Sequence, residues 1–308
     1  MSDKFRVGVI GVGHLGRHHA RILSSLDDVQ LVAVADIKVD RAQQIGGPLG
    51  ARATADYREL FGQVDAVTIA VPTELHGQIA VPFLQRGVPV LVEKPLARTL
   101  SEADRMIAVA CATRATLAVG HTERHNPAVR AAATVVADPR FIEVHRLGAF
   151  PERSLDIDVV FDLMIHDLDI ILSLVPSEVD AIDAVGVPVL TDRVDIANAR
   201  LRFANGCIAN LTASRISRDR VRKIRFFQPD AYISIDYAEQ ECEVYRLVRG
   251  DGLRPNIEGG PMTVEHEEPL RREMIDFATA ARTGTPPAVT GEQGRRALAV
   301  ATRIVEKM

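Results

Sequence analysis

The segment Gly11-Val12-Gly13-His14-Leu15-Gly16 constrains the fold of this chain more than any other stretch of its sequence. It follows the apolar run Arg6–Ile10 directly and opens a predicted helix. At this spacing Gly11 permits a tight turn, Gly13 lets a phosphate approach the backbone, and Gly16 lets the helix pack closely on the strand. The amide groups at the start of the helix also attract negative charge. The segment therefore predicts a dinucleotide-binding turn.

A carboxylate at the end of the second predicted strand supports this interpretation. Asp36 stands 20 residues after Gly16, where an acidic residue accepts hydrogen bonds from ribose hydroxyls and repels a 2′-phosphate. We therefore expect NAD rather than NADP, although Lys38 and Arg41 weaken that preference because either side chain could reach a phosphate. The alternative is a glycine turn with a solvent-facing aspartate. The predicted cofactor-binding residues of this region are Gly11, Gly13, His14, Leu15, Gly16 and Asp36.

The pattern of apolar segments predicts an α/β fold with two domains. Short apolar runs alternate with helical stretches over residues 5–120, as in the doubly wound parallel sheet of a Rossmann domain. The expected strands are Arg6–Ile10, Gln30–Ala35, Ala66–Ala70, Pro89–Val92 and Thr116–Val119, and a Thr99/Glu102 capping box starts one helix. We expect residues 121–308 to form a second, α+β domain.

The second domain is predicted from a change in pattern after residue 120. Helices are expected near 126–137 and 155–174, and strands near 141–149 and repeatedly over 178–248. Asn205-Gly206 is a two-residue hairpin signal inside an antiparallel sheet. Two helices, near 268–282 and 291–307, are expected to close the chain.

Composition excludes several classes of function. The net charge of −4 provides no basic field for nucleic acid or acidic membranes, and tryptophan is absent. The three cysteines are far apart, without the spacing of a disulfide framework or a zinc site, and we expect no metal. The chain has no signal-like segment and no apolar run of membrane-spanning length, so the expected location is the cytoplasm.

A lysine follows a later strand of the first domain. Glu93-Lys94-Pro95 ends an apolar run, and the proline restricts the backbone and so helps to aim the ammonium group. Beside a bound dinucleotide, such a lysine predicts a hydride-transfer enzyme.

A second candidate group lies in the other domain. Asp162, His166 and Asp169 have the i, i+4, i+7 spacing that shares one helix face, in an otherwise apolar segment. Either these residues are satisfied by core hydrogen bonds or they carry function, and a cofactor fold with a candidate lysine favours function. A metal site is less favoured, because alcohol oxidation with a nicotinamide needs none.

Together these motifs resemble the Gfo/Idh/MocA family of NAD(P)-dependent sugar oxidoreductases. The matching segments are Gly11–Gly16, Asp36, Val71-Pro72-Thr73 with His76, Glu93-Lys94-Pro95, and Asp162 with His166. The resemblance implies an open, mainly antiparallel second sheet, a homodimer or homotetramer, and a cis Lys94–Pro95 peptide. It implies catalytic roles for Lys94, Asp162 and His166, and cofactor contacts from Pro72, Thr73, His76, Glu93 and Lys94. The division of proton transfer between Lys94 and His166 stays open.

The basic residues of the second domain bear on the substrate. Arg124, Asn126 and Arg215 are predicted to bind it together with Lys94, Asp162 and His166, the arginines holding an anionic group. A basic strand edge that prevents aggregation is the alternative. The combination resembles family members that act on UDP-N-acetyl-hexosamines, so the expected substrate is a sugar or nucleotide sugar, at best the C3 hydroxyl of UDP-N-acetylglucosamine. An inositol or free-sugar dehydrogenase, or a non-catalytic NAD-sensing regulator, are the alternatives.

Overall fold

The computed structural model of the chain describes residues 4–150, 157–248 and 256–308, which form two compact units. Unit 1 runs to Thr122 and includes Glu268–Arg295, and unit 2 comprises Glu123–Glu267 and Arg296–Met308. The predicted division at residue 120 falls close to the first boundary. It differs in the return of residues 268–295 to unit 1, a contact over a long sequence separation that periodicity does not reveal.

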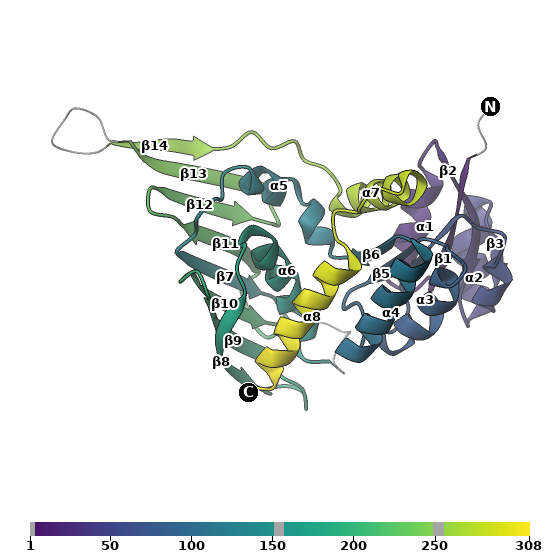
Figure 1. Cartoon of the computed structure of the whole chain (residues 1–308), viewed down its shortest axis with the longest axis horizontal. Helices are drawn as coiled ribbons and strands as arrows, with labels where there is room; N and C mark the ends of the chain where they lie inside the picture. Colours follow the sequence, from purple (N-terminus) through teal and green to yellow (C-terminus); the bar gives the residue numbers. More distant parts are fainter. Residues whose placement is uncertain (1–3, 151–156, 249–255) are drawn as a thin grey trace. The chain divides into compact units, whose positions relative to one another are not determined.

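Unit 1 is built on a parallel sheet of six strands in the order β3-β2-β1-β4-β5-β6 (Figure 1). This is the strand order of a Rossmann fold, in which ligands bind beyond the carboxyl ends of the strands where the order reverses, here between β1 and β4. The strands are β1 Phe5–Ile10, β2 Val29–Ala35, β3 Arg52–Thr54, β4 Ala66–Ile69, β5 Val90–Glu93 and β6 Leu117–Gly120. All five strands expected from the sequence are present.

Helices flank this sheet and bury its apolar side chains. They are α1 Gly16–Ser24, α2 Val39–Gly46, α3 His76–Leu84, α4 Leu100–Thr113, α7 Pro269–Thr283 and the beginning of α8 Gly291–Val305, with 3₁₀ turns at Gly47–Leu49, Tyr57–Leu60 and Thr73–Leu75. A further 3₁₀ turn, Thr122–His125, spans the boundary between the two units in the sequence. The predicted capping box is formed, because Thr99 Oγ1 accepts a hydrogen bond from the Glu102 amide at 3.2 Å. Met274 and Phe277 of α7 pack in the same core as Val7 and Val9 of β1, which explains why α7 belongs to this unit.

Unit 2 contains a sheet of eight strands in the order β14-β13-β12-β11-β7-β10-β9-β8. Neighbouring strands are antiparallel except β7 and β10, which are parallel. The strands are β7 Phe141–Leu147, β8 Val179–Val187, β9 Ile196–Phe203, β10 Ile208–Ser214, β11 Val221–Phe227, β12 Ala231–Asp236, β13 Glu241–Val248 and β14 Asn256–Pro261. The Asn205-Gly206 hairpin joins β9 and β10 as predicted. The open, mainly antiparallel sheet is confirmed.

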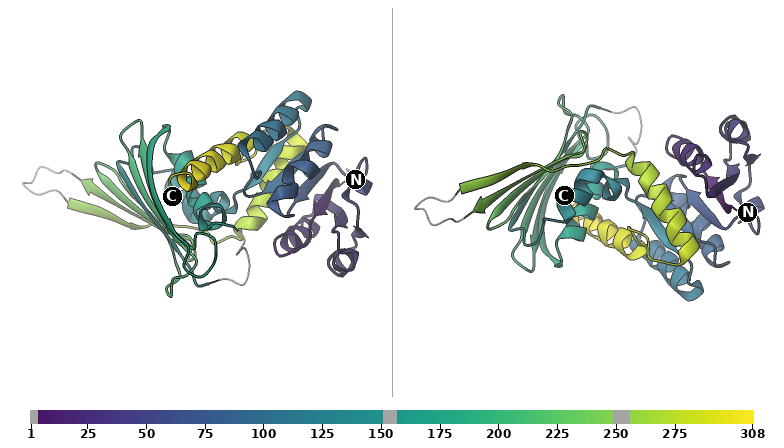
Figure 2. Two further views of the ribbon diagram at one scale, coloured as in Figure 1. Left: turned by 90° about the horizontal axis from the view of Figure 1, so that it is seen from below. Right: turned by 90° about the horizontal axis from the view of Figure 1, so that it is seen from above.

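One face of this second sheet is covered and the other is not. Figure 2 shows α5 Pro127–Ala133, α6 Ile165–Leu174 and the end of α8 along one face. The buried side chains of β7 and β11, among them Val144 and Ile224, have even residue numbers and pack in one core with these helices. Their odd-numbered neighbours form an outer face on which Phe141, Phe227, Tyr232 and Tyr245 make an aromatic ladder across four strands.

The structure adjusts several sequence expectations. The helix expected at 155–174 includes two residues outside the described part of the chain. Residues 157 and 158 are not helical, and the helix begins near Val159 with a π-helical turn, Val160–Met164, followed by α6. The helix expected at 126–137 ends at Ala133, and β3 and β14 were not predicted. No helix in the described part of the chain is both long and apolar enough to cross a membrane.

Candidate active site

The glycine turn of unit 1 has the local geometry that its sequence predicts. Gly11 has a φ of +83°, and an added Cβ would lie 2.7 Å from the Ala70 carbonyl oxygen. A Cβ on Gly16 would lie 1.7 Å from the Gly11 carbonyl oxygen, so α1 can pack on β1 only with glycine here. A Cβ on Gly13 would meet nothing within 4 Å. The backbone at Gly13 therefore borders open space at the start of α1, which fits a dinucleotide phosphate.

Asp36 lies at the end of β2 next to this turn and is held by four hydrogen bonds. The amides of Val12 and Lys38 donate to its oxygens at 3.0 and 2.9 Å, and Arg41 donates through Nε and Nη2 at 3.0 and 2.7 Å. Burial raises the pKa of Asp36, but the Arg41 and backbone hydrogen bonds outweigh it and lower the pKa overall. The carboxylate is therefore ionised and faces the glycine turn. Arg41 is half-exposed, so it can yield these acceptor positions to ribose hydroxyls.

The segment that follows β4 presents two of the predicted cofactor residues. Pro72 is exposed and Thr73 is half-buried at the carboxyl end of this strand. His76, by contrast, is buried, and its ring nitrogens lie 3.0 Å from the carbonyl oxygens of Val71 and Pro95. His76 therefore ties the loop after β4 to the loop after β5, and its ring atoms face backbone. The contact of His76 with the cofactor stays a prediction.

Glu93 and Lys94 are neighbours at the end of β5 but differ in burial. Lys94 is partly exposed, and the Lys94–Pro95 peptide is cis, as the resemblance implies. Glu93 is buried, and it accepts hydrogen bonds from its neighbour's amide at 3.2 Å and from His19 Nε2 at 3.0 Å. Burial raises the pKa of Glu93, but the hydrogen bond and charge of His19 outweigh it and lower the pKa. Glu93 therefore makes its hydrogen bonds inside unit 1 at the end of β5, and its contact with the cofactor stays a prediction.

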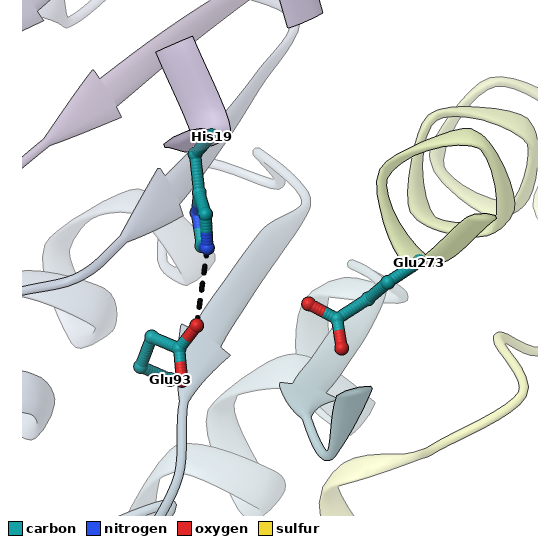
Figure 3. Close-up of side chains that lie close together, drawn as sticks. All are labelled: His19, Glu93 and Glu273. Carbon is teal, nitrogen blue, oxygen red and sulfur yellow. Dashed lines mark hydrogen bonds and ion pairs between the residues drawn. The ribbon is translucent and has the colours of Figure 1, made fainter. Parts of the chain in front are cut away.

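A third buried group completes this interior cluster. Figure 3 shows Glu273 of α7 pointing toward the His19–Glu93 pair. One ligand atom from each of the three residues lies within 4.8 Å of the others, and neither oxygen of Glu273 has a partner with full hydrogen-bond geometry among the described residues. The Thr122 side chain interacts with this carboxyl group and lowers its pKa in part. Burial and the negative charge of Glu93 raise the pKa of Glu273 well above its usual range. Such a group holds either a proton or a cation, and a protonated Glu273 needs nothing else to balance its charge.

In unit 2 the ionisable residues around α6 fall into two classes. Asp162 lies in the π-helical turn and His166 in the first turn of α6, and both are partly exposed. Asp167 is buried and receives two hydrogen bonds from Arg146, at 2.7 and 2.9 Å. Asp169 is also buried, and Arg124 donates to its oxygens at 3.0 and 2.8 Å. Asp162 and His166 are thus less buried than Asp167 and Asp169, and π-helical turns are frequent at functional sites. Asp169, grouped with them by spacing, is a structural ion-pair partner.

Two of the predicted substrate residues form an ion pair or hydrogen bonds within unit 2. Arg124 is largely buried in its ion pair with Asp169. Asn126 is the N-cap of α5: its Oδ1 accepts from the Ala128 amide at 3.0 Å, and its Nδ2 donates to the Tyr237 carbonyl at 3.0 Å. Both side chains therefore have structural partners, and their contacts with the substrate stay predictions.

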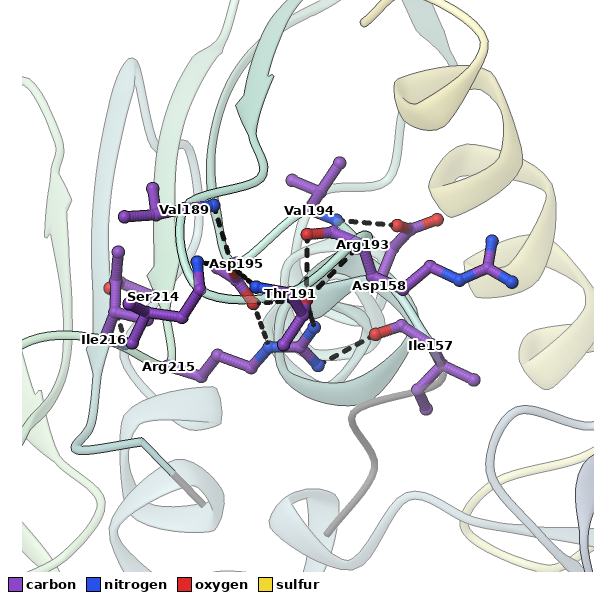
Figure 4. A network of polar contacts seen from close by, with 11 residues as sticks. Ile157, Asp158, Val189, Thr191, Arg193, Val194, Asp195, Ser214, Arg215 and Ile216 are labelled. Carbon is purple, nitrogen blue, oxygen red and sulfur yellow. Dashed lines mark hydrogen bonds and ion pairs between the residues drawn. The ribbon is translucent and has the colours of Figure 1, made fainter. Parts of the chain in front are cut away.

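Arg215, the third predicted substrate residue of unit 2, lies in the network of polar contacts in Figure 4. Its side chain is 1% exposed, and it donates to Asp195 Oδ1 at 2.8 Å, the Ile157 carbonyl at 2.8 Å and Thr191 Oγ1 at 3.1 Å. Asp195 also accepts the amides of the Val189–Thr191 loop. Burial raises the pKa of Asp195, but these backbone hydrogen bonds and Arg215 together lower it strongly. Arg215 thus neutralises a buried carboxylate and orders two loops, which leaves it unsuited to bind an anionic substrate.

Comparison with known proteins places the chain in a family. Residues 5–121 match the oxidoreductase family with an NAD-binding Rossmann fold, and residues 129–235 match the GFO/IDH/MocA C-terminal domain. The chain belongs to the Gfo/Idh/MocA family of NAD-dependent oxidoreductases. Its fold and its NAD-binding turn are those of a dehydrogenase.

Individual relatives are sugar and nucleotide-sugar dehydrogenases. UDP-N-acetylglucosamine 3-dehydrogenase of Acidithiobacillus ferrooxidans is 40% identical over 97% of this chain and 96% of its own. Myo-inositol 2-dehydrogenase of Thermotoga maritima is 28% identical over 95% of this chain and 93% of its own. A solved structure of the A. ferrooxidans enzyme, GnnA, has a TM-score of 0.92 at 38% identity, covering 99% of this chain and 98% of the other.

Several residues of this site escaped sequence reasoning because their role depends on distant partners. His19 follows the glycine turn by one helical turn, and that was its only signal. Glu273 meets Glu93 across a separation that no local pattern reports. Asp167 stands between two residues that were singled out, and only the buried ion pair with Arg146 reveals its role.

Proposed function

We propose that this chain is an NAD-dependent dehydrogenase that oxidises the C3 hydroxyl of UDP-N-acetylglucosamine. The observation that carries the proposal is the full-length similarity, at 40% identity, to an enzyme with that activity. The proposal is also supported by the partial exposure of three candidate side chains: Lys94 after β5 of unit 1, and Asp162 and His166 in and just after the π-helical turn of unit 2.

The cofactor would be held by residues of unit 1. The Gly11–Gly16 turn would bind the pyrophosphate, and Asp36 would bind the adenosine ribose, while Pro72 and Thr73 line the same edge of the sheet. Bound NAD supplies the nicotinamide C4 that accepts a hydride from the C3 carbon. The protein must therefore remove the proton of the C3 hydroxyl as the hydride leaves.

The three candidate catalytic residues divide that task. The unperturbed pKa of histidine lies near neutrality, so the His166 imidazole is suited to accept the hydroxyl proton. Asp162, four residues earlier, would orient the imidazole. The Lys94 ammonium would donate a hydrogen bond to the C3 oxygen and stabilise its developing negative charge.

A second candidate is favoured by the inositol dehydrogenases among the relatives. Myo-inositol also offers a secondary alcohol, and the same three residues would serve its oxidation. We would compare NADH formation from UDP-N-acetylglucosamine, free N-acetylglucosamine and myo-inositol under one set of conditions. Turnover of the nucleotide sugar alone is the expected result, and turnover restricted to free polyols would overturn the proposal.

We also propose that the active form is a homo-oligomer in the cytoplasm, a homodimer or homotetramer associated through the outer face of the second sheet. The support is the aromatic ladder of Phe141, Phe227, Tyr232 and Tyr245 on a face that no helix of unit 2 covers among the described residues. The four rings are each partly exposed, and a contiguous apolar patch of this kind favours association. Sedimentation of the wild-type protein and of a Tyr232→Lys variant tests this surface, and unchanged mass in the variant would contradict it.

A further inference from the structure

Arg222 occupies an unusual position at the beginning of β11. It shares its side of the sheet with Ile224 and Phe226, which are fully buried beneath the helices. Arg222 itself is exposed, so the inner face of the sheet is accessible to solvent at this end of β11. Its guanidinium makes no hydrogen bond or ion pair with any residue that the structure describes. A polar group on the inner face that no part of unit 2 uses is therefore available to a ligand.

The neighbour of Arg222 across the sheet is another arginine. Arg222 pairs with Arg146 of β7 in the antiparallel register, and the two side chains lie on the same face. Like charges placed opposite each other in a sheet destabilise it unless they are neutralised. Arg146 is neutralised, since it binds Asp167 and also Glu123, at 3.2 Å. Arg222 has no counter-ion of its own.

The charged side chains around Arg222 carry more positive than negative charge. Partial burial and the charges of Arg146 and Arg220 lower the pKa of Arg222, and Glu123 and Asp167 offset this only in part. Three guanidinium groups thus face two carboxylates. Arg220 is exposed and makes no ion pair among the described residues. An anion of more than one negative charge would neutralise this end of the sheet.

The location connects this charge to the candidate active site. Arg146, which lies opposite Arg222, binds Asp167, and Asp167 directly follows His166 in α6. We propose that Arg222, assisted by Arg220, binds the diphosphate of a nucleoside-diphosphate sugar and so selects nucleotide sugars over free sugars. This inference rests on the proposed function and deepens it. It also places the anion-binding group elsewhere than Arg124 and Arg215, whose guanidinium groups already bind carboxylates.

The experiment measures binding of UDP and of uridine to the full-length protein by calorimetry, together with turnover of UDP-N-acetylglucosamine. Arg222→Gln should raise the Kd for UDP about tenfold or more, the effect of losing one charge-assisted contact, and leave uridine binding unchanged. The KM for the nucleotide sugar should rise by a similar factor. Arg222→Lys should recover part of the loss, because it restores the charge without the planar guanidinium.

Two controls separate this effect from others. Arg202→Gln removes an exposed arginine from the outer face of β9, and UDP binding should stay at the wild-type value. The Kd for NAD should be the same in all variants, because the NAD diphosphate belongs to the glycine turn of unit 1. Wild-type affinity for UDP in Arg222→Gln would overturn the inference while leaving the proposed function intact. A wild-type protein that neither binds UDP nor oxidises UDP-N-acetylglucosamine would overturn both.

Discussion

Replacing Glu273 by glutamine tests the protonation state of the interior cluster of unit 1. Glu273 is 1% exposed, has no partner with full hydrogen-bond geometry among the described residues, and points toward the ionised Glu93 and its partner His19. The Thr122 side chain opposes the rise of its pKa only in part. Burial raises its pKa well above the usual range, and the charges of Glu93 and Asp276 raise it further. Glutamine has nearly the same shape as a protonated glutamate but cannot ionise. Glu273→Gln should therefore fold normally and lose only the titration.

The size and sign of the effect follow from linkage. Between the unfolded-state pKa of glutamate, about 4.3, and the higher folded-state pKa of Glu273, the folded protein holds a proton that the unfolded chain has released. The free energy of unfolding of the wild type therefore falls as the pH rises through this window, by about 1.4 kcal/mol per pH unit. The glutamine variant lacks this contribution. Relative to the wild type, the free energy of unfolding of the variant should therefore rise by about 1.4 kcal/mol per pH unit as the pH rises from about 5.

Urea denaturation of both proteins across this pH range measures the difference. Glu292→Gln is the matched control, because Glu292 is exposed at the start of α8, and its curve should run parallel to that of the wild type. Parallel curves for Glu273→Gln would refute a protonated Glu273. A metal ion in the cluster would give a different pattern: chelation would destabilise the wild type, and the glutamine variant would be less stable at neutral pH and insensitive to chelator.

Other predictions concern the cofactor turn and the candidate catalytic residues. Gly16→Ala should lower stability by about 1–3 kcal/mol or more, since its Cβ would overlap the Gly11 carbonyl, whereas Gly13→Ala should keep its melting temperature and lose NAD affinity in calorimetry. Asp36→Ser should weaken NAD binding by about tenfold or more relative to NADP, and an unchanged ratio of the two dissociation constants would contradict the assigned role. Lys94→Ala and His166→Ala should each lose at least about 100-fold in kcat while still binding NAD, and near-normal turnover in both would defeat the mechanism.

Local sequence was sufficient to predict the Rossmann unit because its determinants are local. The glycine turn, the five buried apolar strands and the Thr99 cap each depend on neighbouring residues. The strands that were missed lack such a signal. The edge strand β3 has only three residues, and β14 contains Gly259, Gly260 and a proline, a composition that usually indicates a loop.

In the candidate site, the sequence was sufficient to predict the backbone conformation at two positions. It was not sufficient to predict which carboxylate each arginine binds. Gly11 and the cis Lys94–Pro95 bond were anticipated, since glycine spacing and family resemblance determine them. The roles of Arg124 and Arg215 were not, because each binds a carboxylate brought to it only by the tertiary fold. A buried arginine and an anion-binding arginine are identical in sequence. Only the location of their counter-ions distinguishes them, and that criterion points to Arg222.

The central claim is hydride transfer from C3 of a nucleotide sugar to NAD, and an isotopic label follows that hydride directly. The wild-type protein would be incubated with NAD and UDP-N-acetylglucosamine carrying deuterium at C3, and the reduced nicotinamide analysed by mass spectrometry. If the enzyme transfers the C3 hydride to NAD, deuterium appears at the nicotinamide C4 and the product is a 3-keto sugar nucleotide. Reduced cofactor without deuterium, or no reduction of NAD by this substrate while myo-inositol is oxidised, would contradict this claim.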